Sequence, residues 1–302
     1  MNKEELKRNI QLRDRTVRVL SNDGFFRAVC VKNSTSAKTA QENHKLDSIS
    51  ATMLARALSG ASLAAALLNG EERVSIEANG DGDISKVFAE AIQLGEVRGF
   101  VEFKDAGRSI NFTGMDKLLG EGLLRVTRVL YNRSEPVQGI VPIQKGDIST
   151  DLAYFYSQSE QIPSAVILDS KPDSNGMIIQ SGGLLVQAMP GFSEIELIKL
   201  FTHLSQLDPL TDYFEKDLNP LQVLKEVLPF EFEVLSSSAV DFFCRCSKDN
   251  FISKLMTLGK QEIIDMQKTG QNELVCKYCN KHYYLTEEDF MTLTTDLTAK
   301  NN

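Results

Sequence analysis

The pattern of hydrophobic and polar positions divides the chain into three parts, and the first of these mixes strands with helices. Short runs rich in β-branched and aromatic residues predict strands at residues 25–31, 74–77, 99–103 and 123–131. Longer stretches with helical spacing predict helices at residues 49–68 and 147–157. We therefore expect an α+β core domain over residues 1–191.

The second part, residues 192–240, has the apolar spacing of short amphipathic helices. Ser193 and Glu196 predict a capping box at the first helix, and Asn219 with Pro220 predicts the start of the next. Nine acidic residues against three lysines give this part −6 of the chain's net −8. Because helices this short depend on docking an apolar face, we interpret the part as an acidic helical linker that can be released.

The third part, residues 241–302, is a unit so small that it needs a metal, a disulfide or a partner to stay folded. Its apolar spacing predicts two short helices on either side of Gly259, with Gly270 ending the second. These helices would supply a small core. The same part contains four of the five cysteines of the chain.

Composition and charge narrow the function classes. A hydrophobic fraction of 42% with 25% charged residues is typical of a soluble globular protein. The net charge of −8 and the pI near 5.1 argue against nucleic acid or an anionic membrane as a partner. The charged start, Met1–Arg8, has no secretory signal, and the apolar stretch at residues 49–68 carries Arg56. We expect a cytoplasmic protein without a membrane span.

The clustered cysteines indicate a local site. Cys244 and Cys246 form a C-x-C pair, Cys276 and Cys279 form a C-x-x-C pair, and four thiolates can close a tetrahedral shell around one Zn²⁺. His282 could replace one thiolate, but four cysteines already fill the shell. In a reducing compartment such thiols serve as metal ligands or redox switches, and spacing alone leaves a permanent scaffold and a switch both open.

The remaining chemistry is limited. Cys30 falls in step with apolar neighbours on one strand face, which predicts a buried structural thiol. A four-thiolate zinc site carries net −2, and four nearby basic residues could offset that charge: Arg245, Lys248, Lys277 and Lys281.

Two rival functions use the same cysteines. A thiol oxidoreductase would place its C-x-x-C motif in a thioredoxin-like βαβ unit, and the C-terminal part lacks that pattern. A zinc-ribbon nucleic-acid binder would need a basic face, but residues 241–302 carry eight basic and nine acidic side chains. No nucleophile motif accompanies the three histidines, so we expect no enzyme activity.

Several segments, in the same order along the chain, carry a family resemblance. They are residues 97–100, 119–122, 154–163 and 181–190 in the first part, and residues 243–247, 255–259 and 273–279 followed by Tyr283 in the third. Together they closely resemble the redox-regulated 33 kDa heat-shock chaperone family, over nearly the whole chain.

The resemblance implies an ATP-independent holdase that is inactive when reduced and zinc-bound. It implies that oxidation forms Cys244–Cys246 and Cys276–Cys279 disulfides, ejects zinc and exposes a surface for unfolded or oxidatively damaged client proteins. An oxidised homodimer is likewise implied. Loss of zinc would unfold the third part and remove a neighbour of the linker helices.

Overall fold

The computed structural model describes residues 13–105 and 118–300. The charged start of the chain, Met1–Arg8, lies outside the described residues. By its internal contacts the chain forms two compact units, Met1–Phe243 and Cys244–Asn302, and each is described here by itself. None of the helices within the described ranges has the length and apolar character needed to cross a membrane.

The first unit contains a five-stranded antiparallel sheet. Its strands are Arg15–Ser21 (β1), Phe26–Lys32 (β2), Ser164–Pro172 (β8), Ile178–Ala188 (β9) and Phe232–Ala239 (β10). The spatial order is β10-β1-β2-β9-β8, so β2 and β9 flank one another in the interior of the sheet. Most side chains of β2 and β9 are buried, which matches their continuous apolar sequence.

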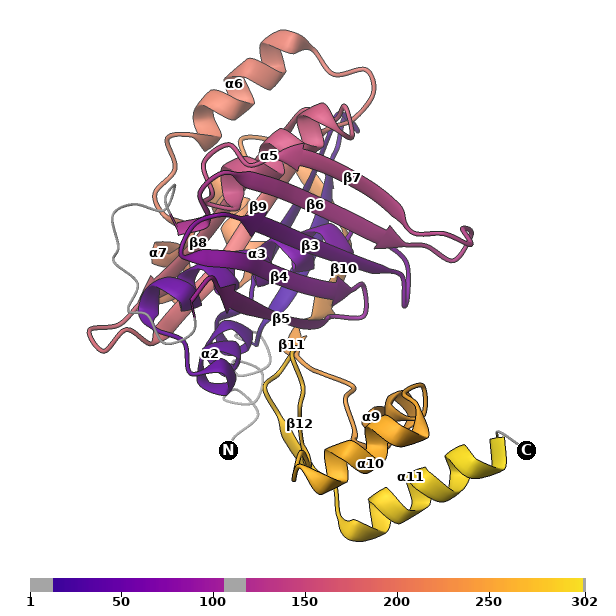
Figure 1. Cartoon of the computed structure of the whole chain (residues 1–302). Coiled ribbons are helices and arrows are strands. Elements are labelled where there is room, and N and C mark those ends of the chain that lie inside the picture. Colours follow the sequence, from indigo (N-terminus) through magenta and orange to yellow (C-terminus); the bar gives the residue numbers. More distant parts are fainter. Residues whose placement is uncertain (1–12, 106–117, 301–302) are drawn as a thin grey trace, which may run out of the picture. The chain divides into compact units, whose positions relative to one another are not determined.

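A second sheet has six strands in the order β11-β5-β4-β3-β6-β7 (Figure 1). These strands are Arg73–Gly80 (β3), Ile84–Ile92 (β4), Glu96–Phe103 (β5), Gly122–Val129 (β6), Val137–Pro142 (β7) and Asp241–Phe242 (β11). Only β11 runs parallel to its neighbour. Buried and exposed positions alternate along β3, as expected for a sheet with one face in the core.

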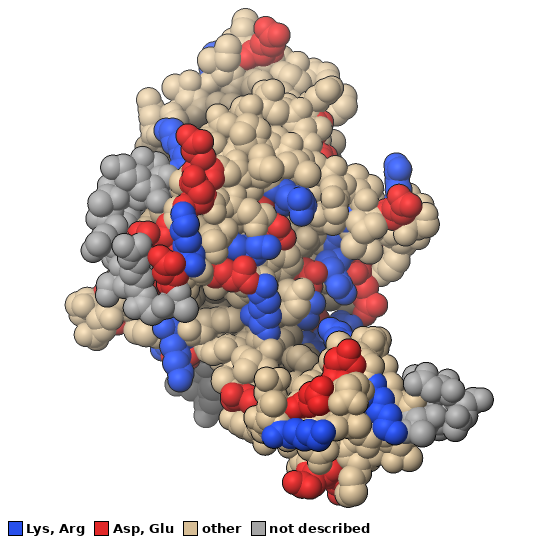
Figure 2. Space-filling model, viewed as in Figure 1, with Lys and Arg blue, Asp and Glu red and all other residues tan. Residues whose placement is uncertain are grey.

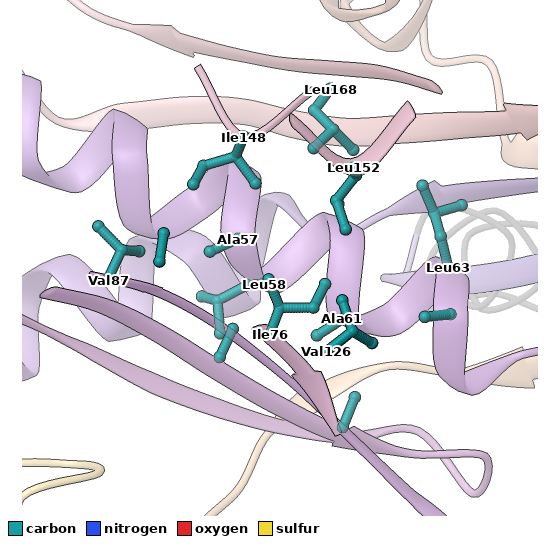
Figure 3. Packing of buried hydrophobic residues seen from close by; sticks show 14 of the residues in the cluster. Ala57, Leu58, Ala61, Leu63, Ile76, Val87, Val126, Ile148, Leu152 and Leu168 are labelled. Atoms are coloured by element: carbon teal, nitrogen blue, oxygen red, sulfur yellow. The ribbon is translucent and has the colours of Figure 1, made fainter. Parts of the chain in front are cut away.

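The largest hydrophobic core of the unit surrounds one helix, Ser48–Ala65 (α3), which packs against strands of both sheets. Asp47 caps the helix by accepting hydrogen bonds from the backbone N–H groups of Ile49 and Ser50. Figure 3 shows α3 side chains meeting residues from β3, β4, β6 and β8. Gly60 lets the Leu152 side chain pack closely against α3, because a Cβ at position 60 would lie 2.6 Å from that side chain.

Two further helices, Ser34–His44 (α2) and Ser149–Gln158 (α5), complete this core. The predicted strands and helices of residues 1–191 are therefore present, and the α+β fold class is confirmed. Strands β1, β4, β7 and β8 were not predicted, because their polar outer faces interrupt the apolar pattern.

The acidic segment forms three helices: Glu194–Leu204 (α6), Leu210–Glu215 (α7) and Pro220–Val227 (α8). Their apolar residues join β1, β2 and β9 in a second core cluster. Asn219 caps α8 and Pro220 stands in its first turn, as predicted, and Gln222 completes a capping box that was not predicted. Ser193 precedes α6, but its side chain makes no capping hydrogen bond, so the capping box with Glu196 was wrong.

The end of this segment corrects a second prediction. We expected residues 192–240 to be helical, yet Phe232–Ala239 is a strand that pairs with β1. The reason is tertiary: β1 offers an open edge of the sheet, and pairing with it satisfies the backbone of β10. Whether residues 192–240 behave as a separate linker stays a prediction.

The second unit is small. It contains the helices Lys248–Leu255 (α9), Lys260–Lys268 (α10) and Glu287–Lys300 (α11) and a hairpin of Glu273–Val275 (β12) with His282–Tyr284 (β13). The predicted break at Gly259 and the predicted end at Gly270, where φ is +69°, are confirmed. Five buried side chains form its core: Ile263, Leu285, Phe290, Leu293 and Leu297.

Charge on the first unit is mixed in sign. Figure 2 shows Lys and Arg side chains interspersed with Asp and Glu on the viewed face. Glu77 of β3, for example, lies 3.5 Å from the Lys86 ammonium and 3.6 Å from the Arg125 guanidinium. Such pairs neutralise one another locally, so this face offers no continuous basic stripe.

Candidate metal centre

Two backbone segments deliver the four clustered thiols. Cys244 and Cys246 lie between β11 and α9, where Ser247 starts the helix by accepting a hydrogen bond from the N–H of Asn250. Cys276 and Cys279 lie in the turn between β12 and β13. In that turn the Cys276 N–H donates to Lys281 (2.9 Å) and the Asn280 N–H donates to Cys276 (2.7 Å), which folds the C-x-x-C motif into a tight knuckle.

The four Sγ atoms converge. All lie within 4.8 Å of one another. Contacts between the two motifs place Cys244 at 3.7 Å from Cys276 and Cys246 at 3.4 Å from Cys279. Cys276 and Cys279 are buried, and the other two are half-buried.

This arrangement fits a tetrahedral metal ion. Four sulfurs at about 2.3 Å from a central Zn²⁺ would lie about 3.8 Å from one another. The observed separations are close to that value, all four cysteines are free thiols, and the described residues place no carboxylate or imidazole ligand among them. The structure therefore brings together the complete predicted ligand set, and the cluster could hold a metal ion.

Tyr283 is a further residue of the site to which the sequence assigned no role. Its hydroxyl donates to the Cys246 carbonyl oxygen at 2.9 Å and lies 3.2 Å from the Cys246 Sγ. The ring packs against Phe251 of α9 and lies under the Lys281 ammonium. Tyr283 thus ties β13 to the first cysteine motif, and hydrogen bonds of this kind orient metal ligands.

The thiols differ in acidity. Burial acts to raise the pKa of the Cys246 thiol, but hydrogen bonds from Tyr283 and the other thiols outweigh it, so its pKa lies below the ordinary value. Burial is the largest cause that raises the pKa of Cys276 and Cys279 above the ordinary value. Among these three, Cys246 ionises most readily.

The alternative ligand His282 points to a different partner. Its Nδ1 lies 2.7 Å from the Glu273 carboxylate, which also accepts a hydrogen bond from Tyr284 at 2.9 Å. His282 is outside the cluster of metal-capable groups found within the described ranges. The all-cysteine set is the one that the fold assembles.

The basic residues expected near the thiols have partners of their own. Lys248 pairs with Asp289 of α11 at 2.5 Å, and the Lys281 ammonium lies 5.3 Å from the centre of the Tyr283 ring. The charge of Lys248 is therefore compensated by a carboxylate, so it offsets thiolate charge less than predicted.

Cys30 is separate from this chemistry. It lies in the middle of β2, fully buried in the core cluster of the acidic helices, and burial raises the pKa of its thiol. The prediction of a structural thiol is confirmed.

Comparisons with known proteins agree with this architecture. The family model of the Hsp33 protein matches residues 14–286. The 33 kDa chaperonin of Bacillus subtilis (strain 168) is 32% identical over 290 residues, covering 94% of this chain and 99% of that protein. The 33 kDa chaperonin of Enterococcus faecalis (strain ATCC 700802 / V583) is 31% identical over 288 residues, covering 93% and 96%.

A solved structure gives the same result for the fold. The crystal structure of the 33 kDa chaperonin (heat shock protein 33 homologue) from Thermotoga maritima superimposes with a TM-score of 0.86 at 28% identity, covering 95% of this chain and 99% of that one. These matches define the class as molecular chaperones, which are not enzymes. The chain belongs to the Hsp33 family, as the sequence resemblance indicated.

Proposed function

We propose that this protein is a redox-regulated, ATP-independent holdase whose switch is the cluster of Cys244, Cys246, Cys276 and Cys279. One observation carries the proposal: four cysteine thiols converge within 4.8 Å in a unit whose core cluster, among the described residues, consists of five buried side chains. A unit with so little apolar burial depends on a cross-link of some kind. The same thiols can supply either of two cross-links.

In the reduced state the four thiolates hold one Zn²⁺. The metal supplies a strong, redox-inert cross-link between the segment before α9 and the β12–β13 turn. Tyr283 orients Cys246 in this shell, and burial of Cys276 and Cys279 limits access to them. Client-binding surfaces stay covered in this state.

Oxidation converts the ligands. The four thiolates give up four electrons to two equivalents of hydrogen peroxide, which take up four protons and leave as water. The proposed products are the Cys244–Cys246 and Cys276–Cys279 disulfides, which no longer bind the metal. All four Sγ atoms lie within 4.8 Å of one another, so these local bonds can form without a large movement of the backbone.

Loss of the metal then releases the second unit. Structural zinc contributes about 10–16 kcal/mol to the folding of small modules, at least as much as the burial of the five core side chains at about 1.5–3 kcal/mol each. The unfolded unit and the acidic helices would expose apolar surface to unfolding proteins. Helix α6 already leaves Ile195 and Ile198 about two-thirds exposed, so this segment starts from weak packing.

Clients, oligomeric state and cellular compartment are also part of the proposal. Clients are unfolded or oxidatively damaged proteins, and the oxidised chains pair as homodimers, in line with the family resemblance. We place the cycle in the cytoplasm, where reducing conditions keep the thiols free between episodes of oxidation.

A light-scattering assay tests this function. Aggregation of a guanidine-unfolded client is followed with the reduced, zinc-loaded protein and with the peroxide-treated protein. We expect protection only from the oxidised form. Cys276→Ser should remove the difference between the two forms, because neither the zinc shell nor the second disulfide can be completed.

Cys30→Ser is the matched control and should keep the full difference, since Cys30 lies in the core of the other unit. Complete oxidation of the four thiols without any gain in protection would reject the switch and leave a permanent scaffold.

A further inference from the structure

The last twelve residues of the first unit form a strap along the edges of both sheets. We use "strap" for Phe232–Phe243, which comprises β10, Val240, β11 and Phe243. β10 pairs with β1 at the edge of the five-stranded sheet, and β11 pairs with β5 at the edge of the six-stranded sheet. The next residue after the strap is Cys244.

The side chains of the strap contribute little to the core. None of the residues in β10 or β11 is buried, and Val234 and Leu235 are about half exposed. Val240 is the exception, with 2% of its surface exposed in the main core cluster. The strap is thus attached by backbone hydrogen bonds, by the buried Val240 side chain, and by Phe232 and Phe242, which pack partly buried against the two core clusters.

The strap passes very close to the backbone of Gly95 where it crosses from one sheet to the other. Asp241 and Phe243 donate backbone hydrogen bonds to Gly95 (2.9 Å) and Val97 (3.0 Å). Gly95 has φ of +99°, and a Cβ there would lie 1.7 Å from the carbonyl oxygen of Ala239. Only glycine lets the strap pass at this point.

Strand β1, which pairs with the strap, is anchored in the core by its own side chains. Alternate side chains of β1, including Val17 and Val19, are buried in the core formed with the acidic helices. On its outer side, the Asp14 carbonyl accepts from Val240 (2.9 Å) and the Asn22 N–H donates to Glu231 (3.0 Å).

Backbone direction alternates along a strand, so the residues between Asp14 and Asn22 that face β10 are Thr16, Arg18 and Leu20. Removal of β10 would leave these peptide groups without partners while β1 stays anchored by β2.

We propose that the edge of β1 is a binding site for clients, which becomes available when the strap leaves and which accepts an extended segment of an unfolded polypeptide as an added strand. An open edge with unpaired peptide groups is the template that β-augmentation uses. In the oxidised protein this inference rests on the proposed function, because unfolding of the second unit removes the anchor that follows Phe243.

The strap itself indicates the chemistry of the occupant. It covers all seven residues of β1 with a segment that carries no proline and presents Phe232, Val234 and Leu235 among polar residues. A client segment of similar length, extended and partly apolar, makes the same backbone hydrogen bonds whatever its sequence. Such independence of sequence is what a general holdase requires.

The variant Val240→Ala tests whether the edge of β1 becomes available when the strap leaves, without oxidation of the cysteines. Truncation of the one buried strap side chain should raise the population of the strap-free form on the order of tenfold in the reduced, zinc-loaded protein. Residue-resolved hydrogen exchange should then be faster by this factor at Thr16, Arg18 and Leu20. Val87→Ala, the same truncation of a β4 residue in the same core cluster, is the matched control and should leave these amides protected.

The probe is reduced, carboxymethylated α-lactalbumin, which is permanently unfolded. Its addition to Val240→Ala should restore protection at Thr16, Arg18 and Leu20 while β10 continues to exchange. Gly95→Ala, which displaces the strap by collision with Ala239, provides a second variant should Val240→Ala fold poorly.

Three results would overturn the inference. The β1 amides could stay protected in both variants, or the probe could bind without restoring their protection. Alternatively, protection could return at high protein concentration without probe, which would assign the edge to a second copy of the chain. Because zinc stays bound throughout, none of these outcomes bears on the redox switch, and failure of the switch would leave the result with Val240→Ala unchanged.

Discussion

The two units of this chain are held together by different means. In the first, the helix α3 is enclosed by strands of both sheets, and the main core cluster draws residues from most strands of the unit, while β1 and the acidic helices belong to a second cluster. In the second, five buried side chains form the core, and α9 has no buried residue at all. The first unit has a large buried core, whereas the second has a small one, and a unit of that size generally needs a metal, a disulfide or a partner.

This difference would allow one chain to combine a permanent platform with the proposed switch. Apolar burial does not respond to oxidants, but a thiolate shell loses its ligands when they are oxidised. The segment between them, from α6 to the strap, is intermediate: it packs through one face of short helices and a strand without buried residues. The order of stability along the chain matches the order in which the proposed mechanism releases its parts.

Removal of the metal should have the largest effect and should affect the two units differently. A chelator in reducing buffer should unfold α9, α10 and α11, because a structural zinc site contributes about 10–16 kcal/mol in small modules. The two sheets of the first unit should keep their protection in hydrogen exchange. Persistent protection of residues 248–268 in the zinc-free protein would show that the second unit folds without the metal.

Truncation of one core leucine in each unit should have different consequences. Leu58→Ala, in α3, should lower the free energy of unfolding of the first unit by about 2–5 kcal/mol in a urea titration, with zinc content unchanged. Leu293→Ala, in α11, should appear instead as weaker retention of zinc against a chelator, since folding and metal binding are coupled there. Equal loss of zinc from both variants would refute this distinction.

Removal of the Tyr283 hydroxyl group should weaken metal binding. Tyr283→Phe removes the hydrogen bonds to Cys246 but keeps the ring against Phe251, and should weaken zinc affinity on the order of 10–100-fold. Tyr284→Phe is the control, because the Tyr284 hydroxyl contacts Glu273 on the exposed side of the hairpin. Chelator competition measures both, and identical affinities would exclude a role for Tyr283 in orienting the ligand.

A surface ion pair should have the smallest effect. The hydrogen bond from Lys248 is the largest of the causes that lower the pKa of Asp289 to about 2. A lowered carboxyl pKa means that the pair stabilises the fold fully above about pH 4 and loses this contribution as the pH falls towards 2. Asp289→Asn should therefore cost the second unit at most about 1 kcal/mol at pH 7, because solvent screens the partly exposed pair.

The measurement is thermal unfolding of the zinc-loaded protein at pH 7, with Asp296→Asn as the exposed control. A loss of several kcal/mol at Asp289 would mean that this pair, rather than the thiols, holds α11 in place.

Sequence reasoning recovered those features that local pattern determines. The mostly small and apolar residues of α3 have the length and spacing of a core helix, and the spacing of Cys276 and Cys279 predicts that the two thiols lie close together. The break at Gly259 follows from the same kind of local signal.

Features that depend on distant residues could not be predicted in this way. β10 has a mixed sequence and becomes a strand because β1, more than two hundred residues earlier, presents an open edge. The role of Tyr283 depends on a contact with Cys246, 37 residues away. Ser193 has the residue types of a capping box, yet the bond is not made, because sequence spacing does not fix side-chain geometry.

The central claim is that the four clustered thiols form a single switch for both metal and client binding. The most direct measurement follows zinc content, free thiols and client protection in one sample during titration with peroxide. We expect one zinc per chain to be lost together with four thiols while protection appears, and Cys30 to remain reduced. Zinc retained after the four thiols are oxidised, or protection that appears before any thiol is lost, would contradict the account.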